Sequence, residues 1–265
     1  MPTTTVVVAL IAGCGAGIVT GLIGASAVTI AVPILVTFTA LPAYAAIGAS
    51  LLTDVFASLV AAWIYHRHGR LHLRSALLIS ATAVAGAQLG SWASTYLPDA
   101  HLGVITAAVI LATGLRFIFR PESLHPPKSP PGTHLRWLRL SPPAQHNLAA
   151  ILGGLIVGLI CGAYGAGGGI SILLLLVYAM GFSPHEAIGT SVLVMALTAA
   201  SGAAGHAIHG ELPWAVASVA AGGGIVGAIS AAAFANRCNE RLLARIAGVA
   251  FATLAALMLA GQYLL

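Results

Sequence analysis

The chain has 265 residues, of which 59% are hydrophobic and only 6% are charged, and its formal net charge at pH 7 is +5. A soluble domain carries about 25% charged residues, so the composition excludes a protein that faces water everywhere and indicates one embedded in a lipid bilayer. The basic residues stand in short loops between apolar segments, where they orient a membrane protein, so the positive charge does not predict nucleic-acid binding. The three cysteines are scattered and predict neither a disulfide framework nor a metal site, and no cofactor is expected.

The first apolar segment, residues 6–41, is too long for one membrane span and too short for two full spans with a turn, because a span needs about 20 residues. Glycines interrupt it near its middle. We therefore predict two short helices that break between Gly21 and Ser26. Three further spans are predicted in this half of the chain, at about residues 44–65, 75–96 and 102–119.

Residues 120–145 are rich in proline and basic side chains. Such a segment cannot stay helical, so we predict a linker that lies extended on one face of the membrane. The second half of the chain then repeats the scheme of the first. Its predicted helices are two short ones at about residues 146–161 and 167–180, followed by spans at about 184–207, 214–235 and 243–264. Ser183, Pro184 and Glu186 have the spacing of a capping box at the start of the first of these spans.

The two halves are copies of one unit at a constant offset of 141 residues, since Gly21 matches Gly162 and Gly24 matches Gly165. The match continues without a gap through residues 46–50 and 187–191, which read AIGAS and AIGTS. We therefore divide the chain into a first membrane repeat, a linker and a second membrane repeat, at residues 1–119, 120–145 and 146–265.

Equivalent loops of the two repeats carry opposite charge bias. Arg67, Arg70 and Arg74 follow the third segment, and the matching loop carries only Glu211. Cytoplasmic loops are enriched in Lys and Arg, so the two copies are predicted to be inserted upside down relative to each other. The expected fold class is an all-α polytopic membrane protein of two inverted repeats, each with about five helical segments and each opening with a Gly-broken hairpin. The linker would be cytoplasmic, and both termini would lie outside the cell membrane.

Inverted repeats with broken helices at equivalent positions are typical of secondary transporters, whose substrate binds near the midplane. Helices that begin inside the membrane, near Ser26 and Gly167, offer unpaired N–H groups and partial positive charge to an anion. A single glycine is better explained by close helix packing, but a pair of breaks at equivalent positions favours a site. The predicted substrate-binding residues are Gly24, Ala25, Ser26, Ser50, Gly165, Gly167, Gly168, Gly169, Thr190 and Ser191.

Asp54 is the one carboxylate clearly inside a predicted span. An intramembrane charge marks a functional site by default, and its repeat equivalent is Met195, so the fold does not require a carboxylate there. A bare carboxylate would repel a permeating anion, and the predicted spans offer no Lys or Arg to pair with it. We therefore predict that Asp54 takes up a proton during the transport cycle. The alternative is a residue at a helix end whose side chain reaches water.

Residues 162–169, which read GAYGAGGG, and the AIGTS motif at 187–191 resemble the second-repeat pattern of the sulfite exporter TauE/SafE family. Residues 21–24, GLIG, with AIGAS at 46–50 are similar to its first-repeat partner. The resemblance covers nearly the whole chain and implies a membrane transporter that moves sulfite, sulfonates or related sulfur anions, usually outward. Many relatives have further glycines where this chain has Ala25, Ser26 and Ala27.

We therefore predict a secondary transporter, not an enzyme, whose partners are a small sulfur oxyanion or organosulfonate and the lipid bilayer. Two other classes stay open: a non-transporting assembly or scaffold protein of the membrane, and an intramembrane hydrolase. The sequence supports the hydrolase only weakly, because no partner base can be assigned to Ser26. His185 and Glu186 are no zinc-protease motif, since Gly189 stands where the second histidine would be. The particular anion, the direction of transport and the oligomeric state are open, a homo-oligomer included.

Overall fold

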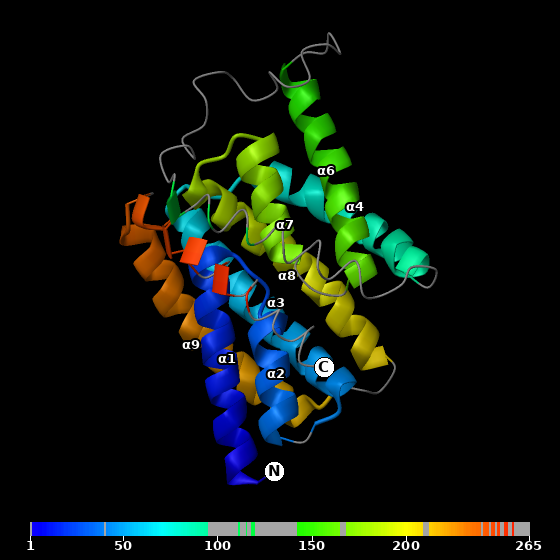
Figure 1. The fold of residues 1–265 in the computed structure, drawn as a ribbon, viewed down its shortest axis with the longest axis vertical. Helices are drawn as coiled ribbons and strands as arrows, with labels where there is room; N and C mark the ends of the chain where they lie inside the picture. Colours follow the sequence, from blue (N-terminus) through cyan, green and yellow to red (C-terminus); the bar gives the residue numbers. More distant parts are fainter. Residues whose placement is uncertain are drawn as a thin grey trace.

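The computed structural model describes residues 2–39, 41–94, 142–164, 168–208 and 212–239, with isolated positions between 111 and 119 and between 241 and 256. Every regular element in this part of the chain is helical (Figure 1), as the predicted fold class requires. Most of the predicted linker, and most of the predicted spans at 102–119 and 243–264, lie outside the described residues.

The described helices fall into two groups of similar order. The first group is α1 (Thr3–Ile23), α2 (Val28–Thr39), α3 (Ala43–Arg67) and α4 (Leu73–Ser94). The second is α6 (Pro142–Tyr164), α7 (Gly168–Leu174) with its π-helical continuation η3 (Leu175–Ala179), α8 (Pro184–Ile208) and α9 (Trp214–Arg237). Four of these helices, α1, α3, α8 and α9, are long and apolar enough to cross a membrane. Helix α6 begins at Pro142, earlier than the predicted start at 146, because a proline in the first turn lacks only an N–H that would have no partner there.

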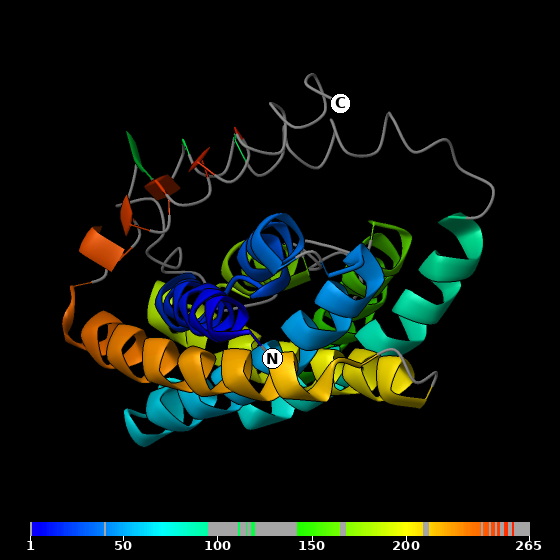
Figure 2. The same cartoon turned by 90° about the horizontal axis from the view of Figure 1, so that it is seen from below.

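Helices α1 and α9 approach each other closely because glycines line their contact. A Cβ atom added to Gly13 would overlap the carbonyl of Ala220, and one added to Gly21 would lie 2.8 Å from the carbonyl oxygen of Ala228. These contacts advance together along both helices, so α1 and α9 run parallel. Small residues that allow close backbone approach are the usual contact between helices in lipid. In Figure 2, α9 lies between α1 and α3.

Helices α4 and α6 pack in the same manner. A Cβ atom on Gly154 would lie 2.9 Å from the carbonyl oxygen of Ile79, and one on Gly158 would overlap the carbonyl of Ala83. These two helices also run parallel. The closest pairs in the bundle therefore join a helix of the first group to a helix of the second, rather than neighbours in sequence.

Helices α3 and α8 pack against each other and run antiparallel. Near one end of α3, a Cβ atom on Gly48 would lie 3.3 Å from Cβ of His206. Near the other end, a Cβ atom on Gly189 would lie 2.9 Å from Cβ of Tyr65. The order of contacts is reversed between the two helices, which fixes their opposite directions.

The start of α8 confirms the predicted capping box. Glu186 Oε2 accepts the backbone N–H of Ser183 at 3.0 Å, and the backbone N–H of Glu186 points to Ser183 Oγ at 3.4 Å. Glu186 Oε1 also meets His72 Nε2 at 3.1 Å, and Arg70 donates from Nη1 to the side-chain oxygen of Asn236 at 3.0 Å. The loop between α3 and α4 is thus bound to both α8 and the end of α9.

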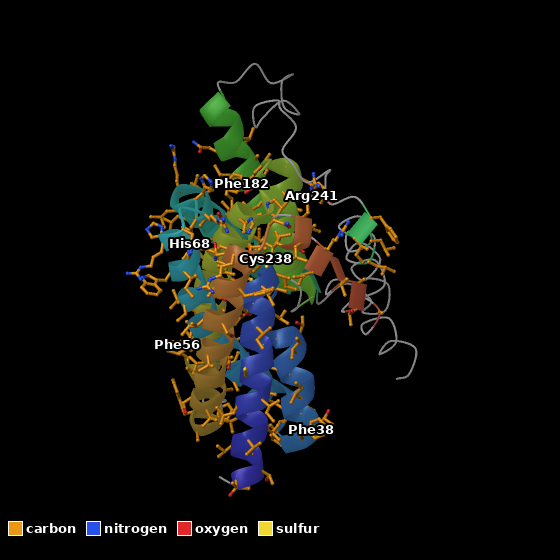
Figure 3. All side chains as sticks on the ribbon, turned by 90° about the vertical axis from the view of Figure 1, so that its left-hand side faces the viewer. Phe38, Phe56, His68, Phe182, Cys238 and Arg241 are labelled. Atoms are coloured by element: carbon orange, nitrogen blue, oxygen red, sulfur yellow. The ribbon has the colours of Figure 1, made fainter. Side chains whose placement is uncertain are left out.

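Large apolar side chains remain exposed around the bundle. Phe38 near the end of α2 is 68% exposed and Phe56 in the middle of α3 is 43% exposed, and Figure 3 places Phe38 toward one end of the bundle and Phe182 toward the other. An apolar outer surface of this kind is suited to lipid, whereas water would make it costly. The polar residues that carry chemistry are instead buried between helices.

Candidate functional site

Helix α1 ends at a break inside the apolar bundle. Gly24 has a φ of 64°, a left-handed conformation that glycine adopts without steric cost, and its N–H bonds to the carbonyl oxygen of Thr20 at 3.0 Å. The backbone then leaves the helix, and α2 begins at Val28. Figure 1 shows α2 beside α1, as their contacts require. We call residues 24–27 the first break.

Asp54 of α3 lies at this break and is only 2% exposed. Three hydroxyl groups surround its carboxyl group. Ser26 Oγ lies 2.6 Å from Oδ2, and Ser58 Oγ and Thr20 Oγ1 lie 3.2 and 3.5 Å from Oδ1. The alternative interpretation of Asp54, a helix-end residue that reaches water, is therefore excluded.

The polar partners of Asp54 are all uncharged. In the part of the chain that the structure describes, no Lys, Arg or His side chain forms an ion pair with it. Isolated charge is costly in an apolar interior and is normally neutralised or paired. The surroundings of Asp54 therefore suit either a protonated carboxyl group or a carboxylate stabilised by hydroxyl donors.

Helix α7 begins at Gly168, and its second residue, Gly169, packs directly against the first break. A Cβ atom on Gly169 would lie 2.5 Å from the carbonyl oxygen of Gly24 and 3.1 Å from Cα of Ala25, and it would overlap the sulfur of Met195. We call the start of α7 the second break. Gly165 and Gly167, which were predicted to belong to it, lie outside the described residues.

Ser191 of α8 completes the contact between the two breaks. It is fully buried, and its hydroxyl donates to the carbonyl oxygen of Ile188 at 3.0 Å. A Cβ atom on Gly24 would overlap Ser191 Oγ. The space beside Gly24 is thus filled by a hydroxyl group from the other half of the chain.

The remaining predicted residues lie elsewhere or face other partners. Thr190 is buried and accepts the backbone N–H of His72 at 3.2 Å, so it faces the loop between α3 and α4. Ser50 is buried and donates to the carbonyl oxygen of Ala46 on its own helix at 2.7 Å. The structure thus brings six predicted residues into one cluster around the breaks: Gly24, Ala25, Ser26, Asp54, Gly169 and Ser191.

Two further residues that contact Asp54, Ser58 and Thr20, were not predicted from the sequence. Ser58 stands one helical turn after Asp54, and residues at this spacing are neighbours on a helix, so it could have been predicted. Thr20 gave no such signal, because the sequence does not reveal which face of α1 meets α3.

The described residues contain no group of three His, Cys, Asp or Glu side chains that could hold a metal ion.

The arrangement combines irregular backbone with buried polar groups inside the bundle. A buried carboxyl group, hydroxyl groups and two helix breaks meet between helices long enough to cross a membrane. Irregular backbone at membrane depth is tolerated where it is buried in protein or lines an aqueous cavity, and in transporters it forms the ion and substrate sites.

Comparisons with known proteins agree with this interpretation. The family model described as "Sulfite exporter TauE/SafE" matches residues 9–258. A probable membrane transporter protein of Bacillus subtilis (strain 168), YdhB, is 24% identical over 224 residues, which cover 83% of this chain and 86% of the relative. A second from the same organism, YunE, is 24% identical over 220 residues, covering 78% and 80%. A probable membrane transporter protein of Xylella fastidiosa (strain Temecula1 / ATCC 700964) is 32% identical over 119 residues, covering 44% and 46%.

No solved structure matches the chain. The family model nevertheless extends over both groups of helices and both breaks, and the relatives that cover most of the chain are membrane transporters by name. The chain is a member of the sulfite exporter TauE/SafE family of membrane transporters.

Proposed function

We propose that this protein is a secondary transporter that exports a small sulfur-containing anion, either sulfite or an organosulfonate. The observation that carries the proposal is the buried contact of the two breaks, in which Gly169 abuts Gly24 and Ala25. Transporters place their substrate where broken helices of two repeats meet. The family description adds the chemical class of the substrate.

The proposal includes an inverted-repeat architecture. Residues 43–67 of α3 correspond to residues 184–208 of α8 at the offset of 141, yet the two helices run antiparallel. The contact of Gly48 with His206 and that of Gly189 with Tyr65 are equivalents of each other under this offset. The parallel pairs α1–α9 and α4–α6 are related in the same way. Such a pattern is expected when two copies are related by a two-fold axis in the membrane plane.

The two breaks would divide the work of transport. In the first break the Ser26 hydroxyl donates its hydrogen to the carboxyl group of Asp54, so this position already holds an acidic group of the protein. In the second break Met195 stands where Asp54 stands in the first, and the first N–H groups of α7 remain the better place for an anion. We propose that the anion binds at Gly168 and Gly169, and that Asp54 takes up a proton so that the anion passes without repulsion.

The driving force would be electrical and chemical rather than ATP. Moving one negative charge outward across a membrane that is negative inside is favoured by about 2.3 kcal/mol per 100 mV. The sequence contains no G-x-x-x-x-G-K-[ST] loop to bind nucleotide phosphates. The proposed topology places both termini outside the cell membrane and residues 120–145 in the cytoplasm. Single cysteines at Ser129 and Glu211 should then be labelled from opposite sides, and labelling from the same side would contradict inverted repeats.

The central experiment is anion flux in proteoliposomes of the purified protein. Vesicles loaded with sulfite or sulfoacetate should release the anion down its gradient, faster when the membrane potential repels it. Protein-free vesicles and vesicles with Gly169→Ala protein are the controls. Equal release from all three, across a panel of sulfur anions, would reject the proposal.

A further inference from the structure

Thr20 links the carboxyl group of Asp54 to the backbone of the first break. Its hydroxyl oxygen lies 3.0 Å from the carbonyl oxygen of Ala25 and 3.5 Å from Asp54 Oδ1. Thr20 and Ala25 are fully buried, and Asp54 is nearly so. No proposed role in binding the anion accounts for this buried chain of three polar groups.

The number of available hydrogens decides which of the two contacts of Thr20 can be a hydrogen bond. A threonine hydroxyl has one hydrogen to donate and two lone pairs, a backbone carbonyl only accepts, and an ionised carboxylate only accepts. The single hydrogen of Thr20 can therefore serve Ala25 or Asp54, but not both. When it points to Ala25, the nearer acceptor, the contact between Thr20 and Asp54 has a hydrogen only if Asp54 carries a proton.

We propose that Thr20 relays the protonation state of Asp54 to the first break. With a proton on Oδ1, Asp54 donates to Thr20, and Thr20 donates to the carbonyl of Ala25. After the proton leaves, the carboxylate accepts the hydrogen of Thr20, and the Ala25 carbonyl loses its donor. This inference deepens the proposed function and rests on it, because it gives Asp54 a path by which its proton changes the transporter.

The loss of that donor has a structural consequence. In the described residues no second group donates to the Ala25 carbonyl, and a buried carbonyl without a partner is costly. The backbone around Ala25 must therefore move to find another donor or water. Cα of Ala25 lies 3.1 Å from the position of a Cβ atom on Gly169. A movement of the Ala25 backbone would therefore change its contact with the start of α7, in the second break.

Other groups that titrate do not contact this chain of bonds. The described groups that contact Asp54 are the hydroxyls of Thr20, Ser26 and Ser58 and the backbone N–H of Ala27. The elements packed against α3 are α1, α2, α8, α9 and, more locally, the loop to α4. Their titratable and charged residues are Cys14 on α1, none on α2, His185, Glu186 and His206 on α8, and Arg237 on α9. The loop adds His68, Arg70 and His72. Helix α3 itself also carries Tyr44, Tyr65, His66 and Arg67.

Several of these groups have partners of their own at the ends of the helices. Glu186 pairs with His72, and His185 Nε2 lies 3.1 Å from the carbonyl oxygen of Ala235. Tyr65 donates from its hydroxyl to the carbonyl oxygen of Gly21 at 3.1 Å. The tested variants change Thr20 alone, so these groups are the same in every variant, and a difference between pH profiles reports Thr20.

The test is the pH dependence of sulfoacetate flux, since the charge of a sulfonate does not change in the neutral range. Thr20→Val keeps the shape of the side chain and removes the hydroxyl, and it should reduce the pH dependence of wild-type flux by at least half, while the direct repulsion between an ionised Asp54 and the anion remains. Thr20→Ser keeps the hydroxyl and should restore at least half of the wild-type response. Thr53→Val is the matched control, because Thr53 is equally buried but donates to Ala49 of its own helix.

A wild-type pH profile in Thr20→Val would overturn the relay, and so would a flat profile in Thr20→Ser. If Thr20→Val protein does not fold, Thr20→Ala supplies the same test with a smaller side chain. The two proposals fail differently: absence of anion flux in wild-type protein rejects transport itself. A wild-type flux that depends on pH, together with an unchanged Thr20→Val profile, rejects the relay alone.

Discussion

The two breaks are lined by different side chains. At the first, Asp54 is held by three hydroxyl groups beside a left-handed glycine. At the second, the equivalent position of α8 is Met195, whose sulfur lies against Gly169. A thioether holds no proton at neutral pH and does not repel an anion. We propose that this difference assigns the proton to the first break and the anion to the second.

The contact between the breaks should be the most sensitive feature of the molecule. Gly169→Ala places a methyl group against the sulfur of Met195 and the backbone of Gly24, and the backbone cannot move aside. Overpacking of this kind costs about 1–3 kcal/mol. We expect no anion flux and a reduced yield of folded protein in size-exclusion chromatography. Gly222→Ala is the matched control, because a Cβ atom there meets nothing within 4 Å, and it should behave as wild type.

Asp54→Asn should have the next largest effect and should separate the first break from the second. An amide is neutral at every pH, so the change removes the group that is proposed to gain and lose a proton. We expect flux that persists but no longer varies with pH. The measurement is sulfoacetate efflux from proteoliposomes between mildly acidic and mildly alkaline buffers. An unaltered pH profile would show that Asp54 is not the coupling group.

Ser26→Ala should have a smaller effect, confined to the first break. The change removes the 2.6 Å hydrogen bond to Asp54 Oδ2. A hydrogen bond to a charged group contributes about 1.5–3 kcal/mol and one between neutral groups about 1 kcal/mol. We expect the transition of the pH profile to shift toward higher pH, because the carboxylate loses a donor that stabilises its charged form. A shift in the opposite direction would mean that Ser26 favours the protonated form.

Tyr65→Phe should give the smallest change. It removes one neutral hydrogen bond, from the Tyr65 hydroxyl to the carbonyl oxygen of Gly21 in the last turn of α1. The expected loss is about 1 kcal/mol of stability, visible as a lowered midpoint in thermal unfolding of detergent-solubilised protein. The affinity for the anion should not change, since the second break does not contact this bond. A large loss of anion binding would instead connect Tyr65 to the substrate.

Much of the architecture could be predicted because apolar length and glycine position are local signals. The capping box at Ser183 and Glu186 set the start of α8, and the charge pattern placed Asp54 inside a span. The glycines marked the end of α1. The described bounds of α3, α4, α8 and α9 follow these signals to within a few residues. Helices α1 and α6, which were predicted to be short, are instead 21 and 23 residues long.

The contacts of the site could not be predicted in the same way. When a helix is apolar on all sides, its sequence does not distinguish a lipid-facing side from a buried one. For this reason Thr190 was grouped with Ser191, although it faces the loop at His72. Ser26 was predicted to bind the substrate at a helix N-terminus, and in the structure its hydroxyl instead bonds to Asp54, a residue from another helix. Such pairings depend on how the helices pack, so they cannot be predicted from the sequence around each residue.

The most direct test of the division between the breaks is equilibrium binding of sulfoacetate to purified protein, measured by calorimetry for wild type, Met195→Asp and Asp54→Asn. Met195→Leu serves as the control for volume. Our account predicts that Met195→Asp abolishes binding, because it introduces a carboxyl group at the anion position, whereas Asp54→Asn and Met195→Leu bind within a few-fold of wild type. Loss of binding in Asp54→Asn together with normal binding in Met195→Asp would contradict the account, since it would place the anion at the first break.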